Sequence, residues 1–207
     1  MNKEDLKQHW ENVYTTKQPN EVSWTQEKPQ TSLDFLYSLN LPKDAKIIDI
    51  GGGDSKLVDF LLEEGYTNIT VLDISGKALE RAKARLGSKA KMVSWIESNV
   101  IDFTPTETYD FWHDRAAFHF LTSEDDKLTY SRLLNKAVRG YALIATFSTS
   151  GPLKCSGLEI QQYNGESLQQ LLGSDFTRIE QKTEDHTTPF DTKQNFLFAC
   201  FKRRVYP

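Results

Sequence analysis

The residues from Ile47 to Ser55, Ile-Ile-Asp-Ile-Gly-Gly-Gly-Asp-Ser, limit what this chain can fold into more than any other stretch. Three β-favouring apolar residues run into three glycines, and a helix-like segment, 56–64, follows without a gap. A buried strand that turns sharply into a helix brings backbone N–H groups and the positive helix end to one place. Glycines let a ligand approach the main chain, because no Cβ stands in the way. The pattern predicts a strand–turn–helix unit with a binding site at the turn.

A second strand-like run, 69–72, ends in Asp73. An acidic residue about twenty positions after such a turn is placed to accept hydrogen bonds from ribose hydroxyls. A dinucleotide fingerprint needs glycine at the sixth place of G-x-G-x-x-G, and counting from Gly51 that place is Lys56. The site is therefore expected to bind a nucleoside cofactor, and Lys56 disfavours a nicotinamide-dependent oxidoreductase.

Asp49-x-Gly51-x-Gly53-x-Ser55 resembles the D/E-x-G-x-G-x-G signature of class I methyltransferases, with serine in place of the last glycine. The resemblance implies S-adenosyl-L-methionine as cofactor, with S-adenosyl-L-homocysteine as product. It also implies a single-domain, Rossmann-like α/β fold with helices on both faces of a seven-stranded sheet. That sheet is expected to be mostly parallel, with an antiparallel last strand.

The order of elements along the chain agrees with this fold. Strands and helices alternate after residue 45, which favours a parallel sheet covered on both faces. After residue 150 two consecutive strands without a helix between them predict an antiparallel hairpin at the sheet edge. We expect an N-terminal helical lid segment (1–44), a cofactor-binding core (45–150) and an acceptor-side hairpin region (151–207). The expected strands are 45–50, 69–72, 92–96, 109–113, 141–147, 176–184 and 196–202, and the expected helices are 56–64, 77–86, 124–139 and 166–172.

The amino-acid composition limits the partners and the location that we expect for this protein. The 207 residues are 38% hydrophobic, which suits one globular domain with a substantial core. The net charge of −4 leaves no basic footprint for nucleic acid, so none is expected as a partner. The two cysteines, Cys155 and Cys200, have no metal-like spacing, and no apolar run reaches membrane length. We expect a cytoplasmic protein with no metal and no membrane association.

Other segments are similar to a narrower group of methyltransferases. That group contains small bacterial enzymes described as thiopurine S-methyltransferase-like and mitochondrial enzymes that methylate a lysine of citrate synthase. The similar segments are His9-Trp10-x-x-x-Tyr14, Val22-Ser-Trp24, Asp114-Arg-Ala-Ala-Phe-His119 and Cys155-Ser-Gly-Leu158.

The resemblance assigns cofactor roles residue by residue. Asp49 would orient the methionine part of the cofactor, and Asp73 would accept from the ribose hydroxyls. Asn99 would accept from the adenine amino group, although methyltransferases often place a charged aspartate there. The other expected cofactor contacts are Gly51, Gly52, Gly53, Ile74, Val100, Tyr14 and Trp24.

The N-terminal aromatic residues, Trp10, Tyr14 and Trp24, lie in the segment that folds over the cofactor as a lid in the resembling enzymes. A lid would bring aromatic faces near the sulfonium, a cation–π arrangement. Part of this set has helical spacing, so core packing is the alternative.

Asp114 ends the fourth expected strand, where binding crevices of open α/β sheets lie. It is the expected catalytic residue, which would orient or deprotonate a protonated acceptor such as a lysine amine. The alternative is that Asp114 only contacts the cofactor and does not act on the acceptor. His119, Trp10 and His186 are candidate substrate contacts. The alternative for His119 is a structural histidine, and the alternative for His186 is an exposed position on the final hairpin.

The sequence predicts direct in-line methyl transfer to a nitrogen, sulfur or oxygen nucleophile of a protein lysine or a small molecule. An alternative from a different functional class is a protein that binds the cofactor without catalysing a reaction and serves as a partner subunit.

Overall fold

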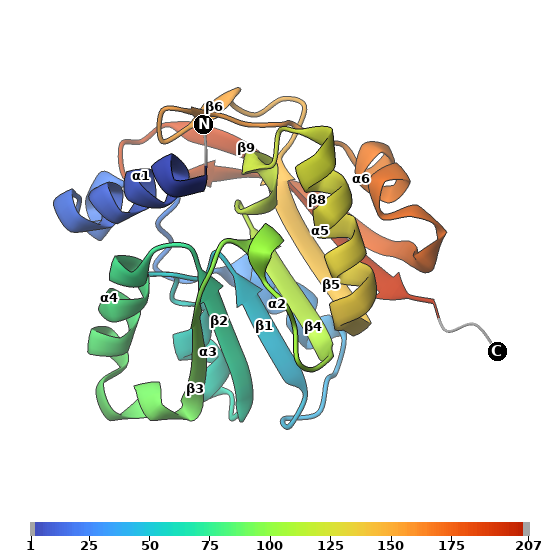
Figure 1. Ribbon diagram of the computed structural model, residues 1–207, viewed down its shortest axis with the longest axis horizontal. Coiled ribbons are helices and arrows are strands. Elements are labelled where there is room, and N and C mark those ends of the chain that lie inside the picture. Colours follow the sequence, from blue (N-terminus) through green and yellow to red (C-terminus); the bar gives the residue numbers. More distant parts are fainter. Residues whose placement is uncertain (1–2, 205–207) are drawn as a thin grey trace. The chain divides into compact units, whose positions relative to one another are not determined.

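A computed structural model describes residues 3–204 of the chain (Figure 1). These residues fall into two compact units, one ending at Phe103 and the other beginning at Thr104. Seven strands form one sheet in the order β3-β2-β1-β4-β5-β9-β8. The single-domain organisation with three segments stays a prediction.

The first unit alternates helices and strands. Its parallel strands keep their apolar residues in register, with Ile47 opposite Ile69 and Ile69 opposite Val93. Ile47, Ile48 and Ile50 are at most 1% exposed, as a strand covered on both faces requires. The elements are α1 (Lys3–Thr16), α2 (Gln30–Ser38), β1 (Lys46–Ile50), α3 (Leu57–Glu63), β2 (Asn68–Asp73), α4 (Gly76–Leu86) and β3 (Val93–Glu97), with 3₁₀ helices at Pro19–Glu21, Gly87–Met92 and Val100–Asp102.

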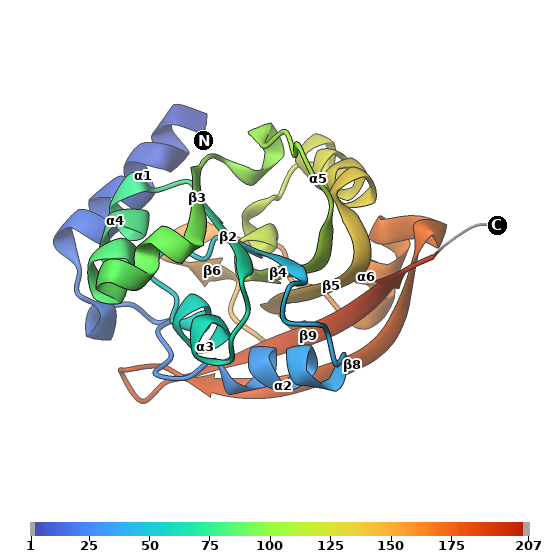
Figure 2. The same ribbon diagram turned by 90° about the horizontal axis from the view of Figure 1, so that it is seen from below.

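The second unit combines a parallel strand pair with a long hairpin. β4 runs parallel to β5, β9 runs antiparallel to β5, and β8 pairs antiparallel with β9 along its length (Figure 2). Every residue from Phe196 to Phe201 is buried. The elements are β4 (Tyr109–Arg115), α5 (Glu124–Ala137), β5 (Val138–Phe147), β6 (Lys154–Cys155), β7 (Leu158–Glu159), α6 (Gly165–Leu172), β8 (Phe176–Thr187) and β9 (Lys193–Arg203), with 3₁₀ helices at Phe118–Phe120 and Gly173–Asp175.

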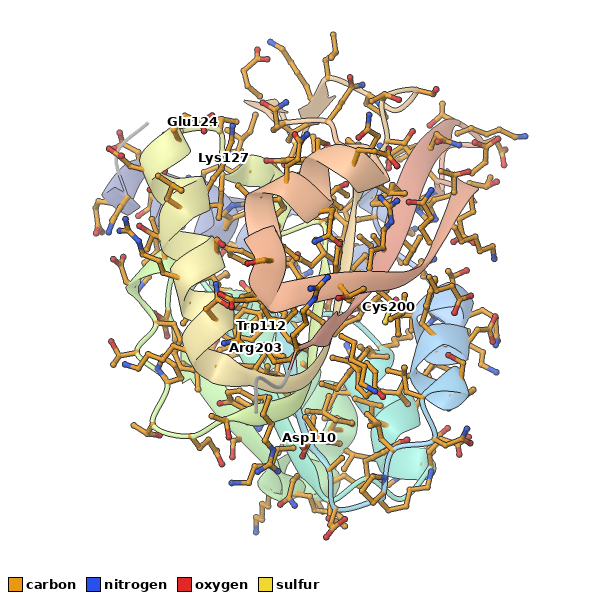
Figure 3. The ribbon with its side chains drawn as sticks, turned by 90° about the vertical axis from the view of Figure 1, so that its right-hand side faces the viewer. Asp110, Trp112, Glu124, Lys127, Cys200 and Arg203 are labelled. Carbon is orange, nitrogen blue, oxygen red and sulfur yellow. The ribbon has the colours of Figure 1, made fainter. Side chains whose placement is uncertain are left out.

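The packing of α5 on β4 is anchored by a chain of hydrogen bonds. The Trp112 indole donates to the Tyr130 hydroxyl (3.0 Å), which donates to Asp114 Oδ2 (2.6 Å). Figure 3 shows Trp112 beside α5, with Glu124 and Lys127 at the first turn of that helix. Ser123 caps the helix by accepting from the Asp126 N–H. The side chains of β4 and α5 are thus joined through polar as well as apolar contacts.

The fold class is confirmed: the protein is α/β, with a mostly parallel seven-stranded sheet whose last strand, β9, is antiparallel. Two details of the sequence prediction are wrong. The helix expected to end at residue 139 ends at Ala137, because Val138 already has extended backbone angles and begins β5. Helix α2, which follows Pro29, was not predicted.

Within residues 3–204, the helices are all too short or too polar to cross a membrane.

Candidate active site

The glycine turn of the first unit is fastened to the end of β2. Both the Gly51 and the Gly52 N–H donate to the Leu72 carbonyl, at 2.8 and 3.2 Å. Gly51 has φ +64°, a conformation that costs a side-chain-bearing residue about 1 kcal/mol or more. Two of the N–H groups expected to face a ligand are therefore used within the fold, and they fix where the turn lies.

Two buried carboxylates explain the next two glycines. A Cβ on Gly52 would lie 2.5 Å from Asp49 Oδ2, and a Cβ on Gly53 would lie 2.5 Å from Asp73 Oδ2. Both distances are far below van der Waals contact. Asp49 lies near the end of β1 and Asp73 ends β2, and they are 2% and 4% exposed. The sequence thus needs glycine at both positions to seat the acidic side chains that were predicted to hold the cofactor.

Asp73 is held in a polar but desolvated environment. Its Oδ1 accepts from the Ser75 N–H (2.8 Å), and the Gly53 N–H also donates to it. Burial raises the pKa of Asp73 to about 7, against those two donors, and the negative charges of Asp49 and Glu11 add to the increase. A group that donates hydrogen bonds to the ionised form, as ribose hydroxyls would, offsets the cost of this burial.

The N-terminal aromatic residues form one cluster in the first unit. Trp10 lies edge-on to Trp24 at 5.7 Å between ring centroids, and Tyr14 is 6.3 Å from Trp24. The Trp24 side chain hydrogen-bonds to Tyr14. Burial raises the pKa of Tyr14 well above its ordinary value, and the nearby carboxylates of Asp73 and Asp54 raise it further. The structure therefore brings Tyr14 close to the proposed ribose carboxylate.

The residues expected around adenine lie after β2 and β3. Asn99 Oδ1 accepts from the Ile101 N–H (3.2 Å) and so caps the 3₁₀ helix that begins at Val100. Val100 is buried, and Ile74 is half-buried between Asp73 and α4. An adenine role for Asn99 stays a prediction beside this capping role.

Three ion pairs that sequence reasoning missed hold the exit of the glycine turn. Arg85 on α4 donates to Asp54 Oδ1 (2.6 Å), to the Ser55 carbonyl (2.7 Å) and to Asp59. Lys56 pairs with Glu27 at 2.5 Å. These pairs join residues that are 26 to 31 positions apart, so no local pattern in the sequence marks them.

In the second unit, Asp114 is completely buried and both of its oxygens are engaged. Oδ1 accepts from the Ala117 and Phe118 N–H groups, each at 3.0 Å, and Oδ2 accepts from Tyr130. Burial raises the pKa of Asp114 to about 6, against the Tyr130, Phe118 and Ala117 donors. The carboxylate thus shapes the turn after β4, where Ala116 has φ +68°. Its catalytic role stays a prediction.

The histidines of the second unit are buried in an aromatic setting. His119 Nδ1 accepts from the Phe147 N–H (3.4 Å), and burial together with Arg115 lowers the pKa of His119 to about 3. The imidazole is therefore neutral, with its proton on Nε2. His186 on β8 is also buried, edge-on to Phe196, so it is not the exposed hairpin residue considered as an alternative.

Comparison with known proteins shows what the chain is similar to. The family model described as "Methyltransferase domain" matches residues 47–139. Mouse "EEF1A lysine methyltransferase 2" is 24% identical over 161 residues, which are 68% of this chain and 64% of that protein. The chain spans 14% of the longer mouse "eEF1A lysine and N-terminal methyltransferase".

Two solved structures share the fold. An S-adenosylmethionine-dependent methyltransferase from Anabaena variabilis has a TM-score of 0.76 and 16% identity, over 99% of this chain and 96% of its own. The 1,6-didemethyltoxoflavin-N1-methyltransferase of Burkholderia thailandensis, solved with S-adenosylhomocysteine, has a TM-score of 0.69 and 17% identity, over 98% and 87%. Residues 47–139 are therefore similar to a methyltransferase domain, and the chain shares the fold of these two structures.

The buried Asp73 predicts that cofactor binding depends on pH. Ribose hydroxyls donate more strongly to an ionised carboxylate, so affinity for S-adenosylhomocysteine should increase as the pH rises through about 7. Between pH 6 and 8 the ionised fraction grows about tenfold, and the Kd measured by calorimetry should fall by a similar factor.

The stability of the free protein should change in the opposite direction. An acid with a raised pKa binds more protons in the folded state, so this group makes the free energy of unfolding fall between about pH 4 and 7. Asp73→Asn should remove both dependences. A Kd that is independent of pH in the unaltered protein would contradict this assignment.

Proposed function

We propose that the protein transfers the methyl group of S-adenosylmethionine to a nitrogen, sulfur or oxygen nucleophile by direct in-line displacement. The observation that carries the proposal is the pair of buried carboxylates, Asp49 and Asp73, seated against Gly52 and Gly53 at neighbouring strand ends. The cofactor would supply a methyl group bound to a sulfonium sulfur. The group that departs is a neutral thioether, so no acid is needed to protonate it. The protein's part is then to align the acceptor and to exclude water.

Within this proposal, the two strand-end carboxylates beside the glycine turn bind two different parts of the cofactor. Asp49 orients the methionine part through its amino group, and Asp73 accepts from the ribose hydroxyls. Ile74, Asn99 and Val100 contact adenine. Tyr14 and Trp24, with Trp10 beside them, cover the methyl-bearing end as a lid.

The acceptor is proposed to be a protein lysine or a small molecule. Support for a lysine comes from the mouse relative named for lysine methylation, which aligns with 68% of this chain. Support for a small molecule comes from the toxoflavin-precursor methyltransferase, which shares the fold. His119, Trp10 and His186 are proposed acceptor contacts, and no nucleic acid is proposed as a partner.

Incubation of the purified protein with methyl-labelled cofactor and a lysate of the source organism tests the activity. We expect label that depends on the added protein, in one protein band for a lysine acceptor or in the small-molecule fraction otherwise. Asp73→Ala is the control that subtracts methylation by the lysate's own enzymes. Intact S-adenosylhomocysteine binding with no protein-dependent label would instead support a non-catalytic partner subunit.

The role of Asp114 is tested by Asp114→Asn. If its charge deprotonates the acceptor, turnover should fall about 10²-fold while the Kd for S-adenosylhomocysteine changes only a few-fold. Tyr130→Phe is the matched variant, because it removes the donor to Asp114 Oδ2 and keeps the charge. It should destabilise the fold by about 1–3 kcal/mol and keep most of the turnover.

Equal losses of turnover in the two variants would assign Asp114 to the turn after β4 instead of to the chemistry. A thiolate acceptor needs no base, so the loss in Asp114→Asn would then be smaller.

A further inference from the structure

Glu11, on the N-terminal helix α1, contacts the first turn of α4. Its Oε1 accepts from the Gly76 N–H (2.7 Å), and its Oε2 accepts from the Ser75 hydroxyl and the Lys77 N–H, each at 3.2 Å. The first N–H groups of a helix have no partner within the helix, and the positive end of its dipole favours a carboxylate. Figure 1 shows α1 lying across and above the upper end of α4, and the two helices are in contact.

The same turn of α4 also holds the proposed ribose carboxylate. The Ser75 N–H donates to Asp73 Oδ1, while the Ser75 hydroxyl donates to Glu11. Ser75 is completely buried and additionally caps α4 by accepting from the Ala78 N–H (3.2 Å). Asp73 and Glu11 are therefore linked through one residue, and a shift of α1 would be transmitted to Asp73.

Helix α1 also carries the aromatic part of the lid. Trp10 precedes Glu11 directly, and Tyr14 lies three residues later, one helical turn away. Arg81 of α4 lies over the Tyr14 ring, 5.8 Å from its centroid, and donates to the Lys17 carbonyl (2.5 Å). The contact of Glu11 with α4 thus fixes the position of α1 along α4, and with it the position of the Trp10 and Tyr14 rings relative to Asp73.

Charges of both signs surround Glu11: Lys7 of α1 and Lys77 of α4 attract it, whereas nearby carboxylates repel it. Its negative charge adds to the increase in the pKa of Asp73, to which Asp49 contributes more strongly. Glu97 lies close as well, since a Cβ on Gly76 would come within 2.6 Å of its Oε2. The pairing of Lys7 with Glu97 (2.6 Å) involves exposed side chains, which contribute little. The donors at the start of α4, together with the positive charges of Lys7 and Lys77, hold a third carboxylate in this region.

We propose that Glu11 is a positioning residue for cofactor binding. Its contact with the first turn of α4, called the latch below, holds helix α1 and its aromatic residues beside Asp73. This rests on the cofactor site proposed above. Loss of the latch releases Trp10 and Tyr14 from their place next to the ribose carboxylate and weakens cofactor binding, while Asp49 and Asp73 themselves stay in place.

The test compares Glu11→Ala and Glu11→Gln with Glu4→Gln, a matched change at an exposed position on the same helix. Calorimetry should show S-adenosylhomocysteine binding weakened about tenfold in Glu11→Ala, less in Glu11→Gln and not at all in Glu4→Gln. Glu11→Gln should also lower the midpoint of the pH dependence of binding, because a negative neighbour of Asp73 is gone while Asp49 is unchanged. The fluorescence change of Trp10 and Trp24 on binding should shrink in both Glu11 variants.

A purely structural contribution would lower the thermal midpoint and leave the pH midpoint unmoved. Unchanged affinity and pH midpoint in both Glu11 variants would overturn the latch, and Glu11→Gln alone decides the matter if Glu11→Ala fails to fold. If the unaltered protein binds no S-adenosylhomocysteine, the cofactor assignment itself fails, which is a different result.

Discussion

The burial of two carboxylates beside a glycine turn is the constraint on which the first unit depends. Removing Asp73 from water costs free energy, visible as a pKa raised to about 7, and the fold offsets only part of it through the Ser75 and Gly53 N–H groups. The glycines at 52 and 53 leave room for these side chains, and the Leu72 carbonyl fixes the turn that carries them. Because the hydrogen bonds within the fold compensate only part of the cost of burying the Asp73 carboxylate, a ligand that donates further hydrogen bonds to it would bind favourably.

The elements around this pair follow from the same constraint. Helix α4 begins immediately after Asp73, and its first turn is capped by Ser75 and by Glu11 from α1. Arg85, nine residues into α4, reaches back to Asp54 and Asp59 and so ties the helix to the exit of the glycine turn. The proposed cofactor site of the first unit is thus one connected set of polar contacts, and Glu11 joins helix α1, which carries Trp10 and Tyr14, to this set.

The sequence was sufficient for the strand–turn–helix unit and for the alternation of strands and helices, because local patterns determine both. The antiparallel last strand was expected from the family resemblance, which the two consecutive C-terminal strands supported. The structure adds a second reason for Gly52 and Gly53, because the nearest neighbours of their missing Cβ atoms are protein carboxylates. The approach of a ligand to these glycines stays a prediction. The contacts of Glu11, Tyr130 and Arg85 join residues that are 16 to 65 positions apart, and nothing local marks them. For the same reason the sequence could not reveal that both oxygens of Asp114 are engaged within its own unit.

The central claim is that Asp73, with its glycine turn, binds an adenosyl cofactor, and calorimetric titration of the purified protein tests it most directly. S-adenosylhomocysteine should bind in the micromolar range and NAD hardly at all, and Asp73→Ala should lose about 1.5–3 kcal/mol of S-adenosylhomocysteine affinity while remaining folded. Tight binding of NAD without any response to S-adenosylhomocysteine, or full affinity in Asp73→Ala, would contradict the account.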